Sequence, residues 1–312
     1  MGAIEDANNR ERILKLLRFK SSQVGDGDEE TRSLQEYLDN MKEWQTQIFY
    51  MPGDDLKAIK KSKFLKTFKE KDIEVLYFDH PIDEYMTNHA NEFQGKTFQS
   101  ITKAGIKLED EDKDMVKRRE KVYKAKFKPA TKFFKDIFGE SLTRVAVSKR
   151  CGDAPALLAA EQHGMSSNME RVIKSQARAT GIPEHSYRSH RVFEFNPRHP
   201  FIIQLNEMVT PSDDSEDDFV TSQSAEDLAW LIHDTAVLNS GYTIQDIPTY
   251  MQRMTRIIQS EMGVDDLSLA DEISPEEDDE IPEDEEEKAR MEELNKDLPP
   301  GYEAGEPQVL IP

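Results

Sequence analysis

The stretch IFYMPGDDLKAIKKSKFLKTFKEKDIEVLYF, residues 48–78, decides the fold of the first part of the chain. Ile48–Met51 and Ile73–Phe78 are short apolar runs of the kind that form buried strands. Pro52-Gly53 marks a turn after the first run. A helical crossover of about twenty residues between two such strands predicts a βαβ unit, in which the strands are parallel.

Helix-capping residues divide the segments on either side of these strands. Asp54 or Asp55 can cap a helix within the crossover, and Ser62 can start another. Upstream, Ser33 can cap a helix that ends near Trp44. Downstream, residues 81–93 predict a helix and KTFQSIT (96–102) an edge strand.

A second set of elements follows and predicts a small mixed sheet that carries helices. Residues 109–138 have a helical, highly charged pattern that Pro129 should kink or divide. Leu142–Ser148, Pro155–Gln162 and Val192–Phe195 are strand candidates. Asn196-Pro197 has the composition of a helix start, with the asparagine as cap and the proline in the first turn.

The segment HGMSSNMERVIKSQA, residues 163–177, combines a loop with a strong helix-start signal. Ser167 and Glu170 have the spacing of a capping box. Met169, Val172 and Ile173 recur at helical spacing on one face. Met165 lies in the loop before the cap. Its side chain either folds back into the core or stays exposed, where a flexible methionine suits partners of varied shape.

Two helices with clear ends predict a hairpin near the end of the folded part. Residues 225–240 end at Gly241 and residues 247–262 at Gly263. Their apolar faces are too wide for a pair of short helices to bury alone. The hairpin either packs onto its own domain or docks against a second copy as a four-helix bundle. The expected stripes contain Leu228, Leu231, Ile232, Thr235 and Leu238 in the first helix, and Tyr250, Met251, Met254, Ile257, Ile258 and Met262 in the second.

Composition excludes several classes of function. The 312 residues carry a formal net charge of −21, which disfavours binding to duplex nucleic acid and to anionic membranes. The single cysteine, Cys151, excludes an intramolecular disulfide. No run approaches the roughly 18 to 20 apolar residues that cross a bilayer. After Asp266, about a dozen acids fall within fewer than twenty positions, which predicts a disordered tail.

Catalytic signals are weak throughout the chain. Gly95-Lys96-Thr97 lacks the upstream glycine of a phosphate-binding loop and precedes a strand pattern. The segment 164–168 ends in Asn168, where a nucleophile elbow has glycine. The histidines and Cys151 show no spacing typical of a metal site. We therefore predict no catalytic, cofactor or metal residues. The alternative is an enzyme that binds a small molecule near Met51–Gly53 and Asp79–Pro81, at the strand ends of the βαβ unit.

Taken in order, these elements resemble the C-terminal part of an Hsp90-family chaperone. The matching stretches include ILKLLRF (13–19), residues 33–53 and 74–105, MSSNMERVIKSQA (165–177), and LNSGYTIQDIPTYMQRMTRII (238–258). The NPRHP form within FEFNPRHP (193–200) and the RILKLLRFKSSQ opening look closer to the endoplasmic-reticulum branch of the family, endoplasmin, than to its cytosolic members.

The resemblance implies an α+β (mixed α/β) fold with three parts. Residues 1–107 would be the last part of the middle domain, 108–266 the dimerisation domain, and 267–312 the acidic tail. The chain would be a fragment without the nucleotide-binding domain, so the ATP and magnesium of the full-length family would act elsewhere. No cofactor is expected here, and the chain alone should not hydrolyse ATP.

The same resemblance implies two protein-binding surfaces of a stress-response chaperone. The terminal helices would form a homodimer through Leu228, Leu231, Ile232, Leu238, Tyr250, Met251, Met254, Ile257 and Ile258. Met165, Met169, Val172 and Ile173 would contact unfolded or partly folded client proteins. Relatives usually carry tryptophan where this chain has Met165, which puts client preference in doubt. A purely structural dimerisation module is a further alternative.

Partners and compartment are also implied by the resemblance. Co-chaperones are expected partners, whereas nucleic acid and membrane insertion are not. Neither a KDEL-like nor an MEEVD ending is present. The expected location is the lumen of the endoplasmic reticulum, with the cytoplasm or another organelle as alternatives.

Overall fold

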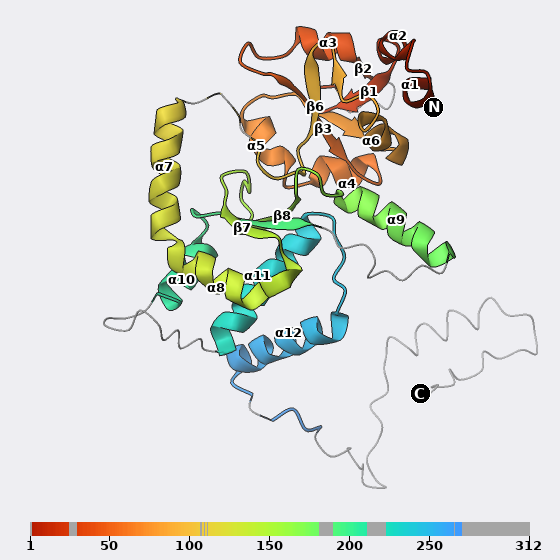
Figure 1. The fold of residues 1–312 in the computed structure, drawn as a ribbon. Coiled ribbons are helices and arrows are strands. Elements are labelled where there is room, and N and C mark those ends of the chain that lie inside the picture. The colour runs from red at the N-terminus through yellow and green to blue at the C-terminus, as the bar shows by residue number, and fades with distance from the viewer. Residues whose placement is uncertain are drawn as a thin grey trace, which may run out of the picture. The chain divides into compact units, whose positions relative to one another are not determined.

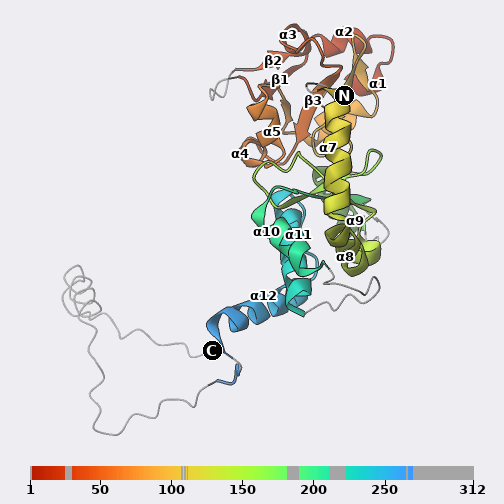
Figure 2. The same cartoon turned by 90° about the vertical axis from the view of Figure 1, so that its left-hand side faces the viewer.

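The computed structural model describes residues 2–24, 30–106, 108, 110, 112–180, 190–210, 223–264 and 266–269. The chain divides into one compact unit that ends at Gly263 and a second unit that begins at Val264. The predicted disordered tail lies almost entirely outside the described residues. Figures 1 and 2 show the first unit, which is an α+β assembly with two mixed sheets, as predicted.

The first sheet has six strands in the order β2-β1-β4-β3-β6-β5. Tyr50 of β3 lies opposite Leu76 of β4 in a parallel pairing, which confirms the βαβ unit. The strands are β1 (Arg18–Ser21), β2 (Arg32–Ser33), β3 (Gln47–Pro52), β4 (Leu76–Phe78), β5 (Glu92–Phe93) and β6 (Lys96–Ser100).

The prediction that residues 96–102 form an edge strand is wrong. β6 pairs with β3 on one side and with β5 on the other. Gln94 and Gly95 both have positive φ angles, 48° and 75°, and turn the chain back as a two-residue hairpin. The short β5 is therefore the edge. The same turn holds the Gly95-Lys96-Thr97 triplet, which ends in a strand and does not open a helix.

Six short helices belong to this first part of the unit. They are α1 (Gly2–Glu5), α2 (Arg10–Leu14), α3 (Leu34–Asp39), α4 (Leu56–Lys61), α5 (Leu65–Glu70) and α6 (Pro81–Thr87). The Ser33 cap is confirmed as a full capping box with Glu36, and Asp55 caps α4. Ser62 ends α4 in an extended conformation, and the second predicted helix appears as α5, which begins three residues later at Leu65.

The second sheet has the order β7-β9-β8, from β7 (Arg144–Val147), β8 (Ala156–Ala160) and β9 (Arg191–Phe195). β7 runs parallel and β8 antiparallel to β9, which confirms a small mixed sheet. Its helices are α7 (Lys113–Lys126), α8 (Lys128–Phe138), α9 (Ser167–Thr180), α10 (Pro200–Met208), α11 (Gln223–Asn239) and α12 (Ile247–Met262). Phe127 separates α7 from α8 beside Pro129, as predicted.

The predicted helix start at Asn196-Pro197 is displaced by three residues. α10 begins at Pro200 and its cap is His199. The Asn196 amide instead donates to the carbonyl oxygens of Gly152 (3.1 Å) and Ala154 (3.3 Å). The asparagine therefore fastens the segment before β8 to the end of β9.

Three apolar cores hold the unit together, and one of them contains residues of both sheets. Phe49 and Phe68 of the first part pack in the same cluster as Cys151, Leu157 and Val192 of the second. The backbone also bridges the two parts, since the Ala104 N–H donates to the Ala160 carbonyl at 2.7 Å. A single core thus spans the domain boundary predicted at residue 107. Among the described residues, no helix is both long and apolar enough to span a bilayer.

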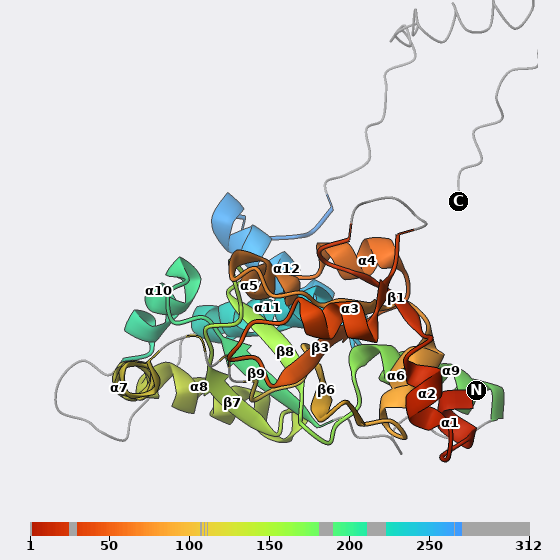
Figure 3. The same cartoon turned by 90° about the horizontal axis from the view of Figure 1, so that it is seen from above.

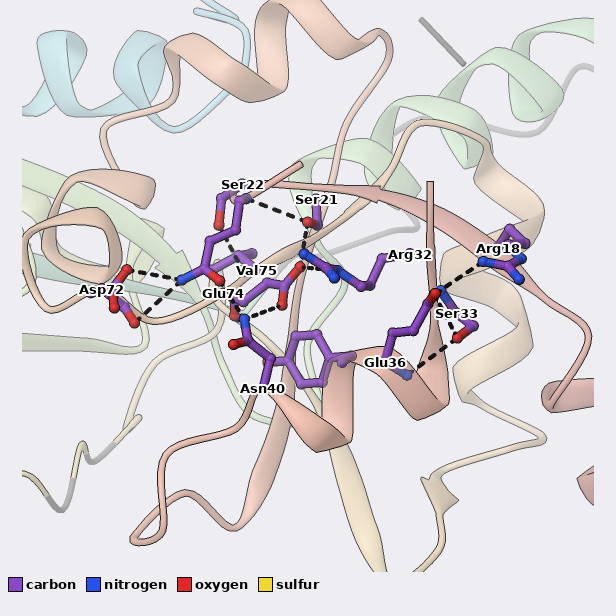
Figure 4. A network of polar contacts seen from close by, with 12 residues as sticks. Arg18, Ser21, Ser22, Arg32, Ser33, Glu36, Asn40, Asp72, Glu74 and Val75 are labelled. Carbon is purple, nitrogen blue, oxygen red and sulfur yellow. Dashed lines mark hydrogen bonds and ion pairs between the residues drawn. The ribbon is translucent and has the colours of Figure 1, made fainter. Parts of the chain in front are cut away.

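A buried carboxylate gathers the elements at one edge of the first sheet (Figure 4). Glu74, 4% exposed, accepts hydrogen bonds from the Ser21 hydroxyl (2.5 Å), the Arg32 guanidinium (3.0 Å) and the Asn40 amide (3.0 Å). Tyr37 donates to the Glu74 carbonyl oxygen at 2.9 Å. Three segments, β1, β2 and α3 with its C-cap, are therefore tied to one residue that is distant from them in sequence.

A buried ion pair likewise ties together elements that are distant in sequence, here from the two sheets. Arg150 donates to both oxygens of Glu194, at 2.9 and 3.3 Å, and to the Ile101 carbonyl at 3.1 Å. The Ser148 hydroxyl also donates to Glu194 at 2.7 Å. Both charged side chains are at least nine-tenths buried.

We predict that Glu194→Ala lowers the free energy of unfolding by about 3–5 kcal/mol, because it leaves Arg150 buried without its counter-ion. Asp153→Ala is the matched control. Asp153 forms ion pairs with Lys63 and Lys66 at the surface, and its loss should cost at most about 1 kcal/mol. Urea unfolding followed by circular dichroism measures both values. Equal losses would contradict the role given to the buried pair.

Candidate functional site

The helix start at α9 is the first candidate site, and its cap differs from the predicted one. Ser166, not Ser167, provides the cap: its hydroxyl accepts from the Met169 N–H at 3.1 Å. The Ser166 carbonyl accepts from the Glu170 N–H at 2.9 Å. The predicted box between Ser167 and Glu170 is therefore wrong by one residue, because the sequence offers two adjacent serines.

Glu84 of α6 receives the polar groups at this helix start. Its Oε2 atom accepts from the Ser166 hydroxyl at 2.9 Å and from the Asn168 amide at 3.2 Å. Burial raises the pKa of Glu84, and these two hydrogen bonds act in the opposite direction. The sequence shows no sign of this contact, because the partners are more than eighty positions apart.

Glu170 has another role than capping. Its carboxylate binds Arg191 of β9 at 2.6 and 2.8 Å and Lys174 at 2.7 Å. Burial alone would raise the pKa of Glu170, but the hydrogen bonds and positive charges of Lys174 and Arg191 lower it. The Arg191 guanidinium also lies 4.3 Å from the ring centre of Tyr242. α9 is thus attached through its polar face.

The four residues predicted to contact clients lie around this attachment. Met169, Val172 and Ile173 follow one another at helical spacing along α9, and Met165 lies in the loop before it. All four are half-buried. Among the described residues, none of the four belongs to the three apolar cores or to the side chains packed against them. They are neither core plugs nor fully exposed.

The second candidate site is the hairpin of α11 and α12, and the buried face of α11 differs from the predicted stripe. Ile232 is buried, Leu228 and Leu231 are half-buried, and Thr235 and Leu238 are exposed. The positions that pack into the core are mostly small: Ala225, Ala229, Ala236 and Val237. Small side chains let α11 lie close to β8, where Ser240 accepts from the Leu158 N–H at 2.8 Å.

Ion pairs attach α12 to α11. Arg256 binds Asp227 at 2.5 and 2.7 Å, and Arg253 binds Asp234 at 2.7 Å. The Arg253 guanidinium also lies 4.5 Å from the ring centre of Trp230. The Arg256 hydrogen bond lowers the pKa of Asp227. The seven-residue spacing of the two aspartates and the three-residue spacing of the arginines are the signal that sequence reasoning missed.

An apolar stripe remains on α12 after this attachment. No residue of α12 is buried. Met251, Ile258 and Met262 are 53%, 49% and 71% exposed. Tyr250, Met254 and Ile257 are half-buried. The residues predicted for the dimer interface are therefore mostly accessible in the single chain, and Figure 2 shows α12 at the end of the unit away from the first sheet.

The described residues give limited support to the alternative that the chain is an enzyme with a small-molecule site. A cavity of about 290 Å³ lies where the end of β3 meets the start of α9, and its lining includes Gly53, Asn168, Arg171 and Ser240. Met51–Gly53 contribute to it, but Asp79–Pro81 do not. In the described part of the chain, no group of three His, Cys, Asp or Glu side chains is arranged to hold a metal. Burial raises the pKa of the Cys151 thiol far above its usual value, so this thiol is a poor nucleophile.

Comparisons with known proteins place the chain in one family. A family model described as "Hsp90 protein" matches residues 1–295. An "Endoplasmin homolog" of Arabidopsis thaliana is 34% identical over 273 residues, which cover 87% of this chain and 31% of the relative. An "Endoplasmin homolog" of Hordeum vulgare is 34% identical over 282 residues, 90% of this chain and 32% of the relative. The chain thus spans about a third of the length of these curated relatives. It belongs to the Hsp90 family.

Proposed function

We propose that this chain is the client-binding and dimerising portion of an Hsp90-type molecular chaperone, which assists protein folding. The observation that carries the proposal is the exposed apolar stripe of α12, a helix that contributes no buried side chain and that two ion pairs attach to α11. ATP binding and hydrolysis would need a part of the family's polypeptide outside these residues. The chain by itself is then inactive as an ATPase.

The position of the stripe supports the proposed dimerisation. Ile247, Met251, Ile258 and Met262 recur at spacings of four, seven and four residues along α12, and Leu238 of α11 is exposed as well. A stripe of this kind buries its apolar surface when two hairpins pack as a four-helix bundle. A two-fold arrangement would bring the stripe against its own copy.

Ile258→Asp should raise the dissociation constant of the homodimer by more than about 100-fold, because a two-fold interface would contain the buried charge twice. Sedimentation velocity of the full chain at micromolar concentration measures this change. Leu16→Asp is the control, since Leu16 is 78% exposed in the first part of the unit. A wild-type monomer, or an Ile258→Asp protein that remains dimeric, would refute the interface.

Client binding is proposed for the surface formed by Met165, Met169, Val172 and Ile173. Half-buried apolar side chains outside the core provide weak contacts that many non-native chains can share. A dimer presents two such surfaces, so two weak contacts to one client gain strength through effective concentration. This is the feature that separates a chaperone from a purely structural dimerisation module.

Met165→Ser/Met169→Ser should increase by about tenfold the concentration of this chain that half-suppresses aggregation of a heat-denatured model protein, because two apolar contacts are lost. Light scattering provides the measurement. Met115→Ser is the matched control, since Met115 is exposed on α7. Unchanged suppression by the double variant would exclude the client surface. A wild-type chain without suppression would favour the structural module.

The compartment proposed for this chain is the lumen of the endoplasmic reticulum. The support is the similarity to two proteins called endoplasmin homologues. The small-molecule alternative is not proposed further, because the cavity beside β3 takes in only one of the two strand ends that such an enzyme would use.

A further inference from the structure

The first turn of α9 is attached to α6 through one carboxylate oxygen. Glu84 Oε2 accepts both the Ser166 hydroxyl at 2.9 Å and the Asn168 amide at 3.2 Å. The three residues are 6%, 1% and 3% exposed. The start of α9 contacts α6, although the two helices come from distant parts of the chain; Figure 3 shows both helices at the same end of the unit.

The contact extends into the backbone of α9. The Ser166 hydroxyl that donates to Glu84 also accepts from the Met169 N–H at 3.1 Å. A continuous chain of hydrogen bonds thus leads from α6 to the backbone of a residue on the apolar face of α9. Because water has no access, loss of the Glu84 acceptor would leave the Ser166 and Asn168 donors unsatisfied.

The ionisable groups near Glu84 do not replace it as the hydrogen-bond acceptor for Ser166 and Asn168. Lys103 is close enough to favour the ionised carboxylate, but its ammonium group donates to the Gln162 carbonyl at 2.9 Å. Tyr50 and Tyr242 are buried nearby, and the charge of Glu84 acts on both. The carboxylate is therefore held by the start of α9, and the start of α9 by the carboxylate.

The other polar attachments of α9 lead elsewhere. Glu170 binds Arg191 of β9, within the second sheet. Arg171 forms an ion pair with Asp54 at the surface, after β3. Among these three attachments, the Glu84 contact is the one that is buried and that joins α9 to α6.

We propose that Glu84 is a positioning residue for the client-contacting helix: by accepting from Ser166 and Asn168 it makes the first turn of α9 follow the position of α6. The inference rests on the proposed client role of α9. A movement of the first sheet would then be transmitted to Met169 through this contact, without a change in the apolar surface itself.

Hydrogen exchange measured by mass spectrometry on the full chain tests this inference. Glu84→Ala should accelerate exchange in residues 166–177 by at least about fivefold, the factor expected for loss of one hydrogen bond of ordinary strength. Exchange in β8 should stay within about twofold of the wild type. Glu84→Gln keeps a carbonyl oxygen at the same place and should leave residues 166–177 protected. Asp153→Ala removes a surface carboxylate outside α6 and α9 and should leave residues 166–177 unchanged.

Three results would overturn the inference. They are unchanged exchange in residues 166–177 of Glu84→Ala, equal acceleration by Glu84→Gln, and equal acceleration by Asp153→Ala. Suppression of aggregation should fall for Glu84→Ala and be retained by Glu84→Gln. The exchange measurement does not depend on clients, whereas the Met165→Ser/Met169→Ser variant tests the client role alone, so failure of one is distinguishable from failure of the other.

Discussion

The cost of taking a carboxylate out of water governs how this fold is assembled. A buried acid is tolerated only where donors or counter-ions surround it, and removal of those partners is far more costly than loss of a surface pair. Glu74 gathers β1, β2 and α3 around β4, and Glu194 joins the second sheet to the segment after β6. Glu84 and Asp227 act similarly for α9 and α12. In an acidic chain, a few carboxylates thus become the joints between elements.

Local signals predicted much of the fold because they depend on neighbours in sequence. The Ser33 cap, one of the two proposed caps at Asp54 or Asp55, and the two apolar strands of the βαβ unit appear as expected. The glycines that end α11 and α12 have the positive φ angles that a helix end favours, 77° at Gly241 and 64° at Gly263. These features need no tertiary information.

The predicted helix caps are wrong where the side chain binds a residue distant in sequence instead of capping its own helix. Asn196 binds carbonyl groups beside β8 and leaves the cap of α10 to His199. Glu170 turns to Arg191, and the cap of α9 shifts to Ser166. On α11, alanines occupy the buried face because the helix lies close to β8, so a stripe of large apolar residues was the wrong expectation. The sequence pattern left each proposed surface as one of two alternatives, and only the family resemblance favoured it, since half-buried methionines have no signature of their own.

The attachment of α12 has a consequence for how related chains pair. α12 contributes no buried side chain to its own protomer, so its apolar stripe is not constrained by a core that must fold first. Arg253 and Arg256 fix the helix in place whatever residues occupy the opposite face. In the proposed homodimer, substitutions on that face would therefore change which copy a chain recognises while leaving the monomer intact. Paralogues that share a compartment would then evolve separate pairing without a penalty in folding.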